Sequence, residues 1–98
     1  MTVPTFEPVA RFLAEFHRLS PAQQAAFRHA VALFRDGLTS GSFHPKLRVK
    51  SFKSESGVYE MTWAYNGRAL WQYGDPIPGK PGPHVEWLRI GTHDIFER

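Results

Sequence analysis

The stretch from Val58 to Gly74, VYEMTWAYNGRALWQYG, decides the fold of this 98-residue chain. Apolar and polar residues alternate on either side of Tyr65-Asn66-Gly67, and such runs around a turn sequence predict a β-hairpin. Two registers are open. A two-residue turn mixes aromatic and polar groups on each face, whereas a three-residue loop with left-handed Gly67 and a bulge places Ala64 opposite Arg68.

The bulged register gives the hairpin one apolar and one polar face. The apolar face then carries Tyr59, Met61, Trp63, Ala69, Trp71 and Tyr73, and the other carries Glu60, Thr62, Arg68, Leu70 and Gln72. Because a slip of one residue would turn the aromatic row into water, we predict the bulged register.

A last strand is predicted from His84, after a loop rich in proline and glycine at 75–83. Leu88 and Ile90 form an apolar row in it, and Trp87 lies on the second row with Arg89. The strand ends at Gly91 and leads into a tail that carries His93 and Phe96. A single histidine can merely decorate an exposed tail, so the other basic residues decide whether His93 has a role.

A basic strand is predicted from Lys46 to Phe52, upstream of the hairpin. Lys46, Arg48 and Lys50 alternate with Leu47 and Val49, which places the cations on one face. A polar turn that begins at Lys53 connects this strand to the hairpin. An edge strand protected by charge is the alternative interpretation of the same pattern.

Two helices are predicted before these strands, over Pro8 to Leu19 and Ala22 to Phe34, because apolar residues recur at helical spacing. Ser20 suits the N-cap of the second helix, which Asp36-Gly37 should close. Phe6 belongs either to a short first strand or to a hydrophobic staple. The predicted fold class is α+β, an N-terminal helical hairpin packed on a twisted antiparallel sheet, with residues 1–98 forming a single domain.

The composition favours a phosphate-rich partner, since the net charge is +3 and the isoelectric point is about 9.6. The chain has no cysteine, which excludes disulfides, thiolate zinc sites and a cysteine nucleophile. It begins without the features of a signal peptide and has no apolar run of membrane-spanning length, so we expect a cytoplasmic protein.

The predicted polar face gathers Lys46, Arg48, Lys50, Glu60, Arg68, Arg89 and His93, with Trp87 and Phe96 as exposed aromatic residues. Converging cations and aromatic rings suit a phosphate backbone and its unstacked bases. RNA fits better than duplex DNA, because both helices use their apolar stripes on the sheet and neither is free to serve as a recognition helix.

The order of elements and the segments HPKLRVK, VYEMTWAYNGRALWQY and IGTHDIF resemble the RelE/ParE superfamily of toxin–antitoxin toxins over nearly the whole chain, and most of all its RelE and YafQ-like branch. By this resemblance Lys46, Arg48 and Lys50 match the family's basic strand, Arg68 its hairpin arginine, His93 its catalytic tail position and Phe96 its terminal aromatic residue. The chain departs from the pattern where Phe96 replaces the tyrosine of RelE, and where Ala64 and Arg68 occupy the positions of YafQ's hairpin histidine and aspartate.

The resemblance implies a toxin of a type II system, a metal-independent endoribonuclease that cuts mRNA, usually on the ribosome, and that a cognate antitoxin silences. No cofactor and no membrane partner are expected. The predicted catalytic residues are His93, Arg68, Arg89, Lys50 and Glu60, and the predicted substrate-binding residues are Lys46, Arg48, Lys53, Trp87 and Phe96.

The chemistry gives these residues their roles. An imidazole exchanges protons near neutrality, so His93 is the general acid or base, while Arg68 and Arg89 grip phosphate oxygens. Glu60 is either a second proton carrier or a counter-ion to Arg68. His44 is a weaker catalytic candidate, and His17, His29 and His84 are expected at the surface.

Two other functions fit the same scaffold. One is a non-catalytic, ParE-like gyrase inhibitor, and the other is a basic RNA- or protein-binding module without chemistry. Cleavage of mRNA by the wild-type chain separates the nuclease from both.

Overall fold

The computed structural model describes residues 3–92 of the chain. Its elements, in order, are β1 (Thr5–Pro8), α1 (Ala10–Arg18), α2 (Pro21–Ser40), the short 3-10 helix η1 (Pro45–Leu47), β2 (Lys50–Ser51), β3 (Tyr59–Ala64), β4 (Gly67–Gly74) and β5 (His84–Thr92). The two helices and the five-stranded sheet confirm the predicted α+β class.

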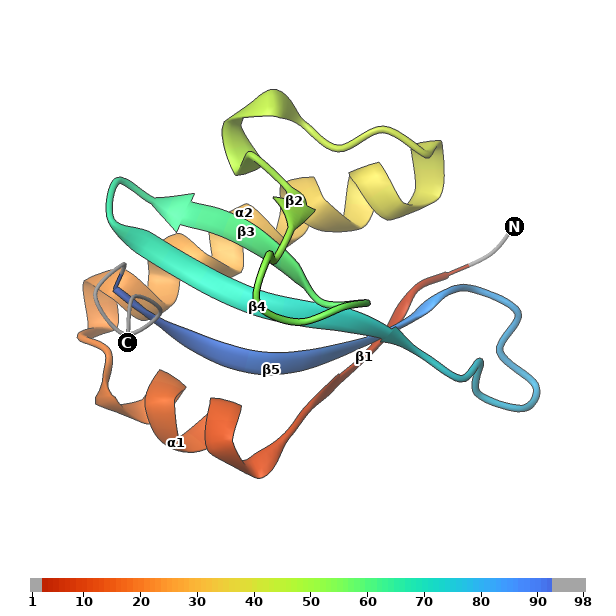
Figure 1. Cartoon of the computed structure of the whole chain (residues 1–98), viewed down its shortest axis with the longest axis horizontal. Coiled ribbons are helices and arrows are strands. Elements are labelled where there is room, and N and C mark those ends of the chain that lie inside the picture. The colour runs from red at the N-terminus through yellow and green to blue at the C-terminus, as the bar shows by residue number, and fades with distance from the viewer. Residues whose placement is uncertain (1–2, 93–98) are drawn as a thin grey trace.

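The strands form one sheet in the order β1-β5-β4-β3-β2 (Figure 1). The β2–β3, β3–β4 and β4–β5 pairs are antiparallel, but β1 runs parallel to β5, with Phe6 opposite Val85. The sheet is therefore mixed, and the expectation of a wholly antiparallel sheet was wrong at this edge. Phe6 belongs to the first strand, which settles the alternative left open by the sequence.

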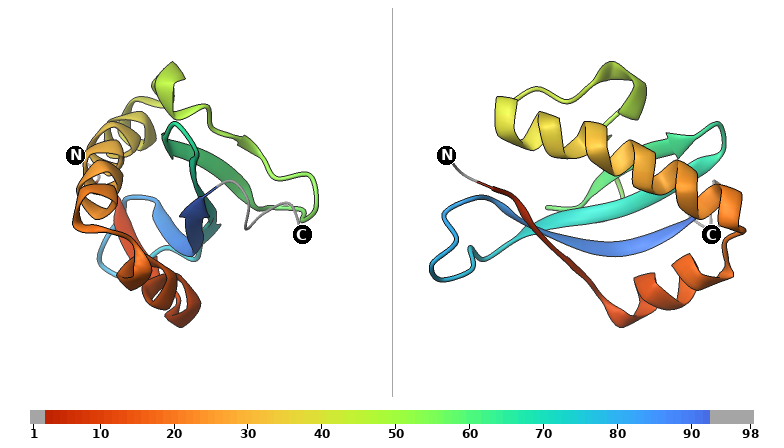
Figure 2. Two further views of the ribbon diagram at one scale, coloured as in Figure 1. Left: turned by 90° about the vertical axis from the view of Figure 1, so that its left-hand side faces the viewer. Right: turned by 180° about the vertical axis from the view of Figure 1, so that it is seen from behind.

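Both helices pack on one side of the curved sheet (Figure 2). We call the face toward the helices the inner face and the opposite face the outer face. Helix α2 lies across the sheet, and α1 runs alongside the part of β5 that β1 does not cover. The helices therefore close the core from one side.

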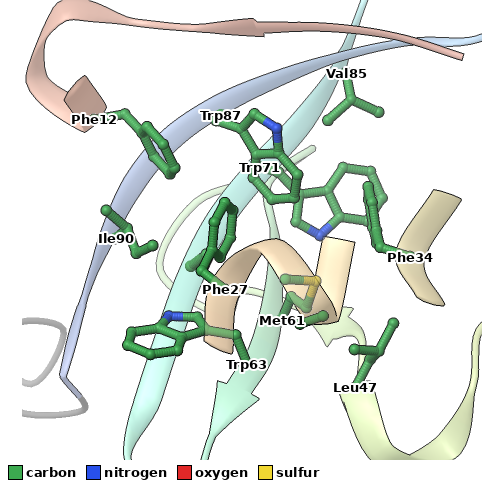
Figure 3. Packing of buried hydrophobic residues seen from close by; sticks show 12 residues of the cluster. Phe12, Phe27, Phe34, Leu47, Met61, Trp63, Trp71, Val85, Trp87 and Ile90 are labelled. Atoms are coloured by element: carbon green, nitrogen blue, oxygen red, sulfur yellow. The ribbon is translucent and has the colours of Figure 1, made fainter. Parts of the chain in front are cut away.

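The core is a cluster of aromatic rings between α2 and the inner face (Figure 3). Phe34 is fully buried and meets Trp71 edge-on, with ring centroids 4.8 Å apart. Phe27 meets Trp87 in the same way at 5.2 Å. Such pairs contribute about 0.5–1.5 kcal/mol beyond the area that they bury. The aromatic row of the hairpin therefore joins the helices to the sheet.

The faces of the hairpin are those predicted, but a different device produces them. Met61 pairs with Ala69 on the inner face, and Thr62, rather than Ala64, pairs with Arg68. The bulge lies between Thr62 and Ala64, so Trp63 is the extra residue and Tyr65-Asn66 is a two-residue turn. The predicted faces are confirmed, whereas the predicted pairing of Ala64 with Arg68 and the three-residue loop were wrong.

The backbone of Gly67 is not left-handed, in contrast to the prediction. Close packing explains instead why this position is a glycine. A Cβ on Gly67 would lie 2.5 Å from Cε2 of the Trp63 ring. The indole of the bulged residue thus covers the backbone at the start of β4, and only a glycine leaves room for it.

A second bulge, in β5, overturns the predicted rows of the last strand. Leu70 pairs with Arg89 and Trp71 pairs with Trp87, so Leu88 is the extra residue. The bulge brings Trp87 onto the same inner face as Ile90, and both are buried. Trp87 was expected on the exposed row of Arg89, which was wrong because strict alternation ends at the bulge.

The segment predicted as a basic strand is mostly not a strand. Residues Pro45–Leu47 form η1, Arg48 has a left-handed backbone with φ 47°, and β2 is confined to Lys50–Ser51. The His44 Nδ1 atom accepts a hydrogen bond from the Lys46 N–H at 3.0 Å, which fixes the turn. Lys46, Arg48 and Lys50 therefore do not form one row.

The second helix begins as predicted and ends later. Ser20 caps it, because its Oγ accepts from the Gln23 N–H at 3.1 Å and the Gln23 side chain accepts from the Ser20 N–H. Helix α2 runs through Gly37, whose missing Cβ admits the ring of Phe43, and stops at left-handed Gly41. Among the residues described, neither α1 nor α2 combines the length and apolarity that a membrane crossing requires.

Candidate nucleic-acid interface

A pocket of about 670 Å³ opens where α2, η1 and the tip of the β3–β4 hairpin meet. Three of its lining residues are cations, namely Lys46 in η1, Arg48 directly after η1, and Arg68 at the start of β4. The remaining lining residues are Ala26, His29, Ala30, Leu33, Leu47, Thr62, Trp63, Ala64, Tyr65 and Asn66. We call this site the basic pocket.

The turn around η1 brings Lys46 and Arg48 to the pocket. Leu47 is 1% exposed and packs against the core, which turns its two neighbours outward. Lys46 and Arg48 are both exposed. A short helical turn thus delivers two cations to one pocket, where the predicted strand would have spread them along an edge.

Arg68 enters the same pocket from the hairpin. Its Nη1 atom donates to the carbonyl of Gly67 at 3.0 Å and to those of Ala64 and Tyr65 at 3.4 Å each. Within residues 3–92, Nε and Nη2 have no hydrogen-bond acceptor. The turn therefore holds the guanidinium in place from one side, and its other donors can grip a phosphate.

Two further side chains of the basic pocket were missed by the sequence analysis as site residues. Tyr65 is 99% exposed at the hairpin tip, where its ring can stack on a base. His29 projects from the wall formed by α2 and is exposed, as predicted for a surface residue. The signal for His29 is its spacing: it lies three residues after Ala26 and four before Leu33, so all three share one helical face.

Lys50 and Glu60 lie outside the basic pocket and pair with each other. They are opposite one another in the β2–β3 ladder, and Lys50 Nζ lies 3.6 Å from Glu60 Oε1. The Lys50 side chain is 71% exposed, so solvent screens the pair. Glu60 is thus a counter-ion, as one of its two predicted roles requires, but its partner is Lys50 rather than Arg68.

Arg89 was expected beside Arg68 and lies elsewhere. Its Nη2 donates to Glu15 Oε2 at 2.6 Å, and its Nε donates to the same oxygen at 3.2 Å. This fork ties β5 to α1, and Arg89 does not line the basic pocket. A guanidinium bound to a carboxylate is a poor phosphate clamp, which removes Arg89 from the candidate site.

The bond network also changes the acidity of Glu15. Burial raises the pKa of this carboxyl, but the hydrogen bonds from Arg89 and from the Ile90 N–H outweigh it. The pKa of Glu15 therefore lies below its ordinary value. The carboxylate is a permanent anion near neutrality and keeps Arg89 occupied.

The other predicted site residues are distributed as follows. Trp87 is buried in the core and cannot stack on a base. Lys53 is exposed in the turn after β2 and is not part of the basic pocket. His93 and Phe96 lie outside the described residues. The structure thus brings together three of the predicted cations, Lys46, Arg48 and Arg68.

His84 was expected at the surface and is 4% exposed. Its Nδ1 lies 2.8 Å from the Thr5 hydroxyl and its Nε2 lies 3.2 Å from Glu7 Oε1. The prediction failed because β1 covers the edge of β5, which a lone histidine at the start of a strand does not reveal.

Comparison with known proteins places the fold. No model of a protein family and no curated protein matches the sequence. Among solved structures, the chain is similar to one in the E. coli DinJ–YafQ toxin–antitoxin complex, with a TM-score of 0.69, 10% identity and 94% of each chain covered. It is also similar to E. coli YafQ alone, with a TM-score of 0.56, 13% identity and 94% of this chain and 96% of that chain covered.

A third similar structure is the RelBE2 toxin–antitoxin complex of Mycobacterium tuberculosis. Its TM-score is 0.60 at 22% identity, over 94% of this chain and 93% of that chain. The protein therefore has the fold of the RelE/ParE toxin superfamily, as the sequence analysis expected.

Proposed function

We propose that the protein is the toxin of a type II toxin–antitoxin system and acts as an endoribonuclease on mRNA. The proposal rests on one observation above all. Lys46 and Arg48 from the turn at η1, together with Arg68 from the hairpin, line one pocket, with the fully exposed ring of Tyr65 at its edge. Proteins bind single-stranded RNA through cations that contact its phosphates and aromatic rings that stack on its bases, and this pocket offers both.

The reaction is transesterification by the ribose 2′-OH. A base takes the 2′ proton, the 2′ oxygen bonds to phosphorus, and the bond from phosphorus to the 5′ oxygen breaks as an acid protonates the leaving group. Arg68 is the proposed stabiliser of the charge that develops on the phosphorane, through Nε and Nη2, while its Nη1 is bound to the turn. Lys46 and Arg48 bind the adjacent backbone phosphates, Lys46 through its compact ammonium charge and Arg48 through paired guanidinium hydrogen bonds. The products are a 2′,3′-cyclic phosphate and a free 5′-OH, and no metal takes part.

Proton transfer is assigned to imidazole groups. His93, in the tail that follows β5, is the proposed acid or base, as in the sequence analysis. His29 is the second proposed proton carrier, because it is an exposed imidazole that lines the basic pocket. Glu60 is removed from this role by its ion pair with Lys50.

The proposed partners, an antitoxin and mRNA, are inferred from the charge of the basic pocket. We propose a cognate antitoxin that covers the basic pocket with an acidic segment and thereby competes with RNA. The mRNA is proposed to be presented by the ribosome, which holds it single-stranded. A cytoplasmic location is proposed with it.

Mapping of mRNA ends after incubation with translating ribosomes tests the proposal. The wild-type chain should cut a reporter mRNA, leaving 2′,3′-cyclic phosphate ends, and His93→Ala and His29→Ala should each cut it more slowly. Lys80→Ala, in the loop between β4 and β5, is the matched control and should cut at the wild-type rate. Absence of cleavage by the wild type, with inhibition of gyrase supercoiling, would instead favour the non-catalytic ParE-like function.

A further inference from the structure

A second polar cluster lies at the other end of the sheet, on the outer face. It consists of Glu7 on β1 with His84 and Glu86 on β5, and each residue offers a ligand atom within 4.8 Å of the other two. The parallel register sets Glu7 opposite Glu86 and Thr5 opposite His84, so these side chains share one face. Strand pairing alone therefore brings the cluster together.

The two less exposed members of the cluster, His84 and Glu86, each contact a polar neighbour outside the cluster. The Thr5 hydroxyl lies 2.8 Å from His84 Nδ1, and Gln72 Nε2 donates to Glu86 Oε1 at 2.7 Å. His84 Nε2 then lies toward Glu7, 3.2 Å from its Oε1, and Glu86 keeps its second carboxylate oxygen for a further contact. Metal-binding histidines and carboxylates characteristically have such outer partners, which fix the tautomer of the ring and the rotamer of the carboxylate.

The backbone beside the cluster is kept clear. Gly74 pairs with His84 across the β4–β5 ladder, and a Cβ on Gly74 would lie 2.8 Å from His84 Cδ2 and 2.9 Å from Glu86 Oε2. Any other residue would push the imidazole and the carboxylate out of their positions. Gly74 is thus required by the cluster rather than by its own backbone conformation.

We propose that Glu7, His84 and Glu86 bind a divalent transition-metal ion of the Zn²⁺ class. One imidazole nitrogen and two carboxylate oxygens are donor types that zinc accepts, and three protein ligands leave a further position for water. His84 Nε2 and Glu7 Oε1 are 3.2 Å apart, so one ion can bind to both, and its charge would offset the repulsion between the two carboxylates. No metal was expected from the sequence, in which Glu7 and His84 lie 77 residues apart and no local pattern joins them.

The metal would act as a clip between the first strand and the rest of the sheet. Strand β1 has only four residues and is joined to the sheet through β5 alone. The clip is remote from the basic pocket, because Gly74 lies six positions after Arg68 along β4, or about 20 Å at ~3.3 Å per residue. A structural metal here is therefore compatible with RNA cleavage that needs none.

Titration of the chelator-treated full chain with ZnCl₂ and CoCl₂ tests the site. We expect one ion per chain by calorimetry, a rise in Tm, and a shift of the His84 ring nitrogens alone among the five histidines in ¹H–¹⁵N spectra. Glu7→Gln and Glu86→Gln should each weaken binding at least about tenfold, and Gln72→Ala should weaken it by about 10–100-fold. Glu7 is exposed, so Glu7→Gln keeps the fold intact.

Glu55→Gln, in the exposed turn between β2 and β3, is the control and should bind the ion as the wild type does. Absence of saturable binding, or binding that neither Glu7→Gln nor Glu86→Gln weakens, would overturn the proposal. The measurement is independent of RNA cleavage, so failure of the metal site and failure of the nuclease are separate results.

Discussion

Glu15 of α1 binds both the side chain and the backbone of β5 through Arg89 and its neighbour. Its Oε2 accepts from Arg89 Nη2 at 2.6 Å, while its Oε1 accepts from the Ile90 N–H at 3.1 Å. Strand β1 pairs with β5 only as far as Trp87, so the edge of β5 beyond that point would otherwise present an unpaired N–H. The Glu15 carboxylate thus accepts the backbone hydrogen bond of Ile90 that a neighbouring strand would otherwise accept.

Glu15→Gln should lower the free energy of unfolding by about 1.5–3 kcal/mol at pH 7, because hydrogen bonds to a charged group are lost. The pKa of Glu15 is lowered in the folded state from 4.5, so its stabilising contribution is present above that pH. The contribution is lost as the pH falls through the lower folded value. Urea denaturation of both proteins at pH 7 and at pH 3 measures this, and the gap should be smaller at pH 3.

Glu55→Gln, which removes an exposed carboxylate that has no such partners within residues 3–92, is the control and should change stability little at either pH. A gap between Glu15→Gln and the wild type that stays constant down to pH 3 would contradict the assigned ion pair.

Gly67→Ala should destabilise the protein by about 1–3 kcal/mol, because the added methyl group would overlap the Trp63 ring. Thermal unfolding followed by tryptophan fluorescence measures the loss and reports the indole directly. Gly79→Asn is the matched control, since Gly79 has φ +81° and open space around it, and asparagine tolerates that backbone. Equal stability of Gly67→Ala and the wild type would show that the indole does not cover Gly67.

Much of the fold could be predicted from the sequence, because the aromatic row of the hairpin can be buried in only one way. Met61, Ala69 and Trp71 share the buried face, because the bulge at Trp63 restores under a two-residue turn the faces that were predicted for a three-residue loop. The Ser20-Pro21 signal similarly fixed the start of α2. Local sequence patterns predicted the structure correctly where a single requirement, burial of an apolar row or capping of a helix, decided between the alternatives.

The candidate site was harder to predict, because small departures from regular structure place its residues. The bulge at Leu88 moved Trp87 into the core, and the turn at Arg48 replaced a strand. Neither leaves a clear mark on the hydrophobic pattern. The capture of Arg89 by Glu15 joins residues 74 positions apart, and no local pattern encodes such a contact.

Glu60→Gln should leave both stability and RNA cleavage close to the wild type. Its partner Lys50 is largely exposed, so the pair contributes at most about 1 kcal/mol. Chemical denaturation and a cleavage time course check the two expectations separately. A large loss of cleavage with unchanged stability would restore Glu60 as a proton carrier, and Lys50→Ala would then tell whether the pair acts as a unit.

Arg68→Ala should lower the rate of RNA cleavage on the order of 10²-fold, because the guanidinium is the proposed stabiliser of the phosphorane. The Nη1 bonds to Ala64 and Tyr65 are long, at 3.4 Å, so the loss of stability should stay below about 1.5 kcal/mol. Single-turnover cleavage and Tm, measured on the same preparation, separate the two effects.

Arg68→Lys distinguishes a forked clamp from a simple positive charge. Lysine keeps the charge but cannot donate two parallel hydrogen bonds to one phosphate, so cleavage should recover only in part. Arg35→Ala, on an exposed turn of α2 away from the basic pocket, removes the same side chain as a matched control and should cleave normally. If Arg35→Ala and Arg68→Ala were equally impaired, the chain would be reading overall charge, and the basic pocket would have no special part in cleavage.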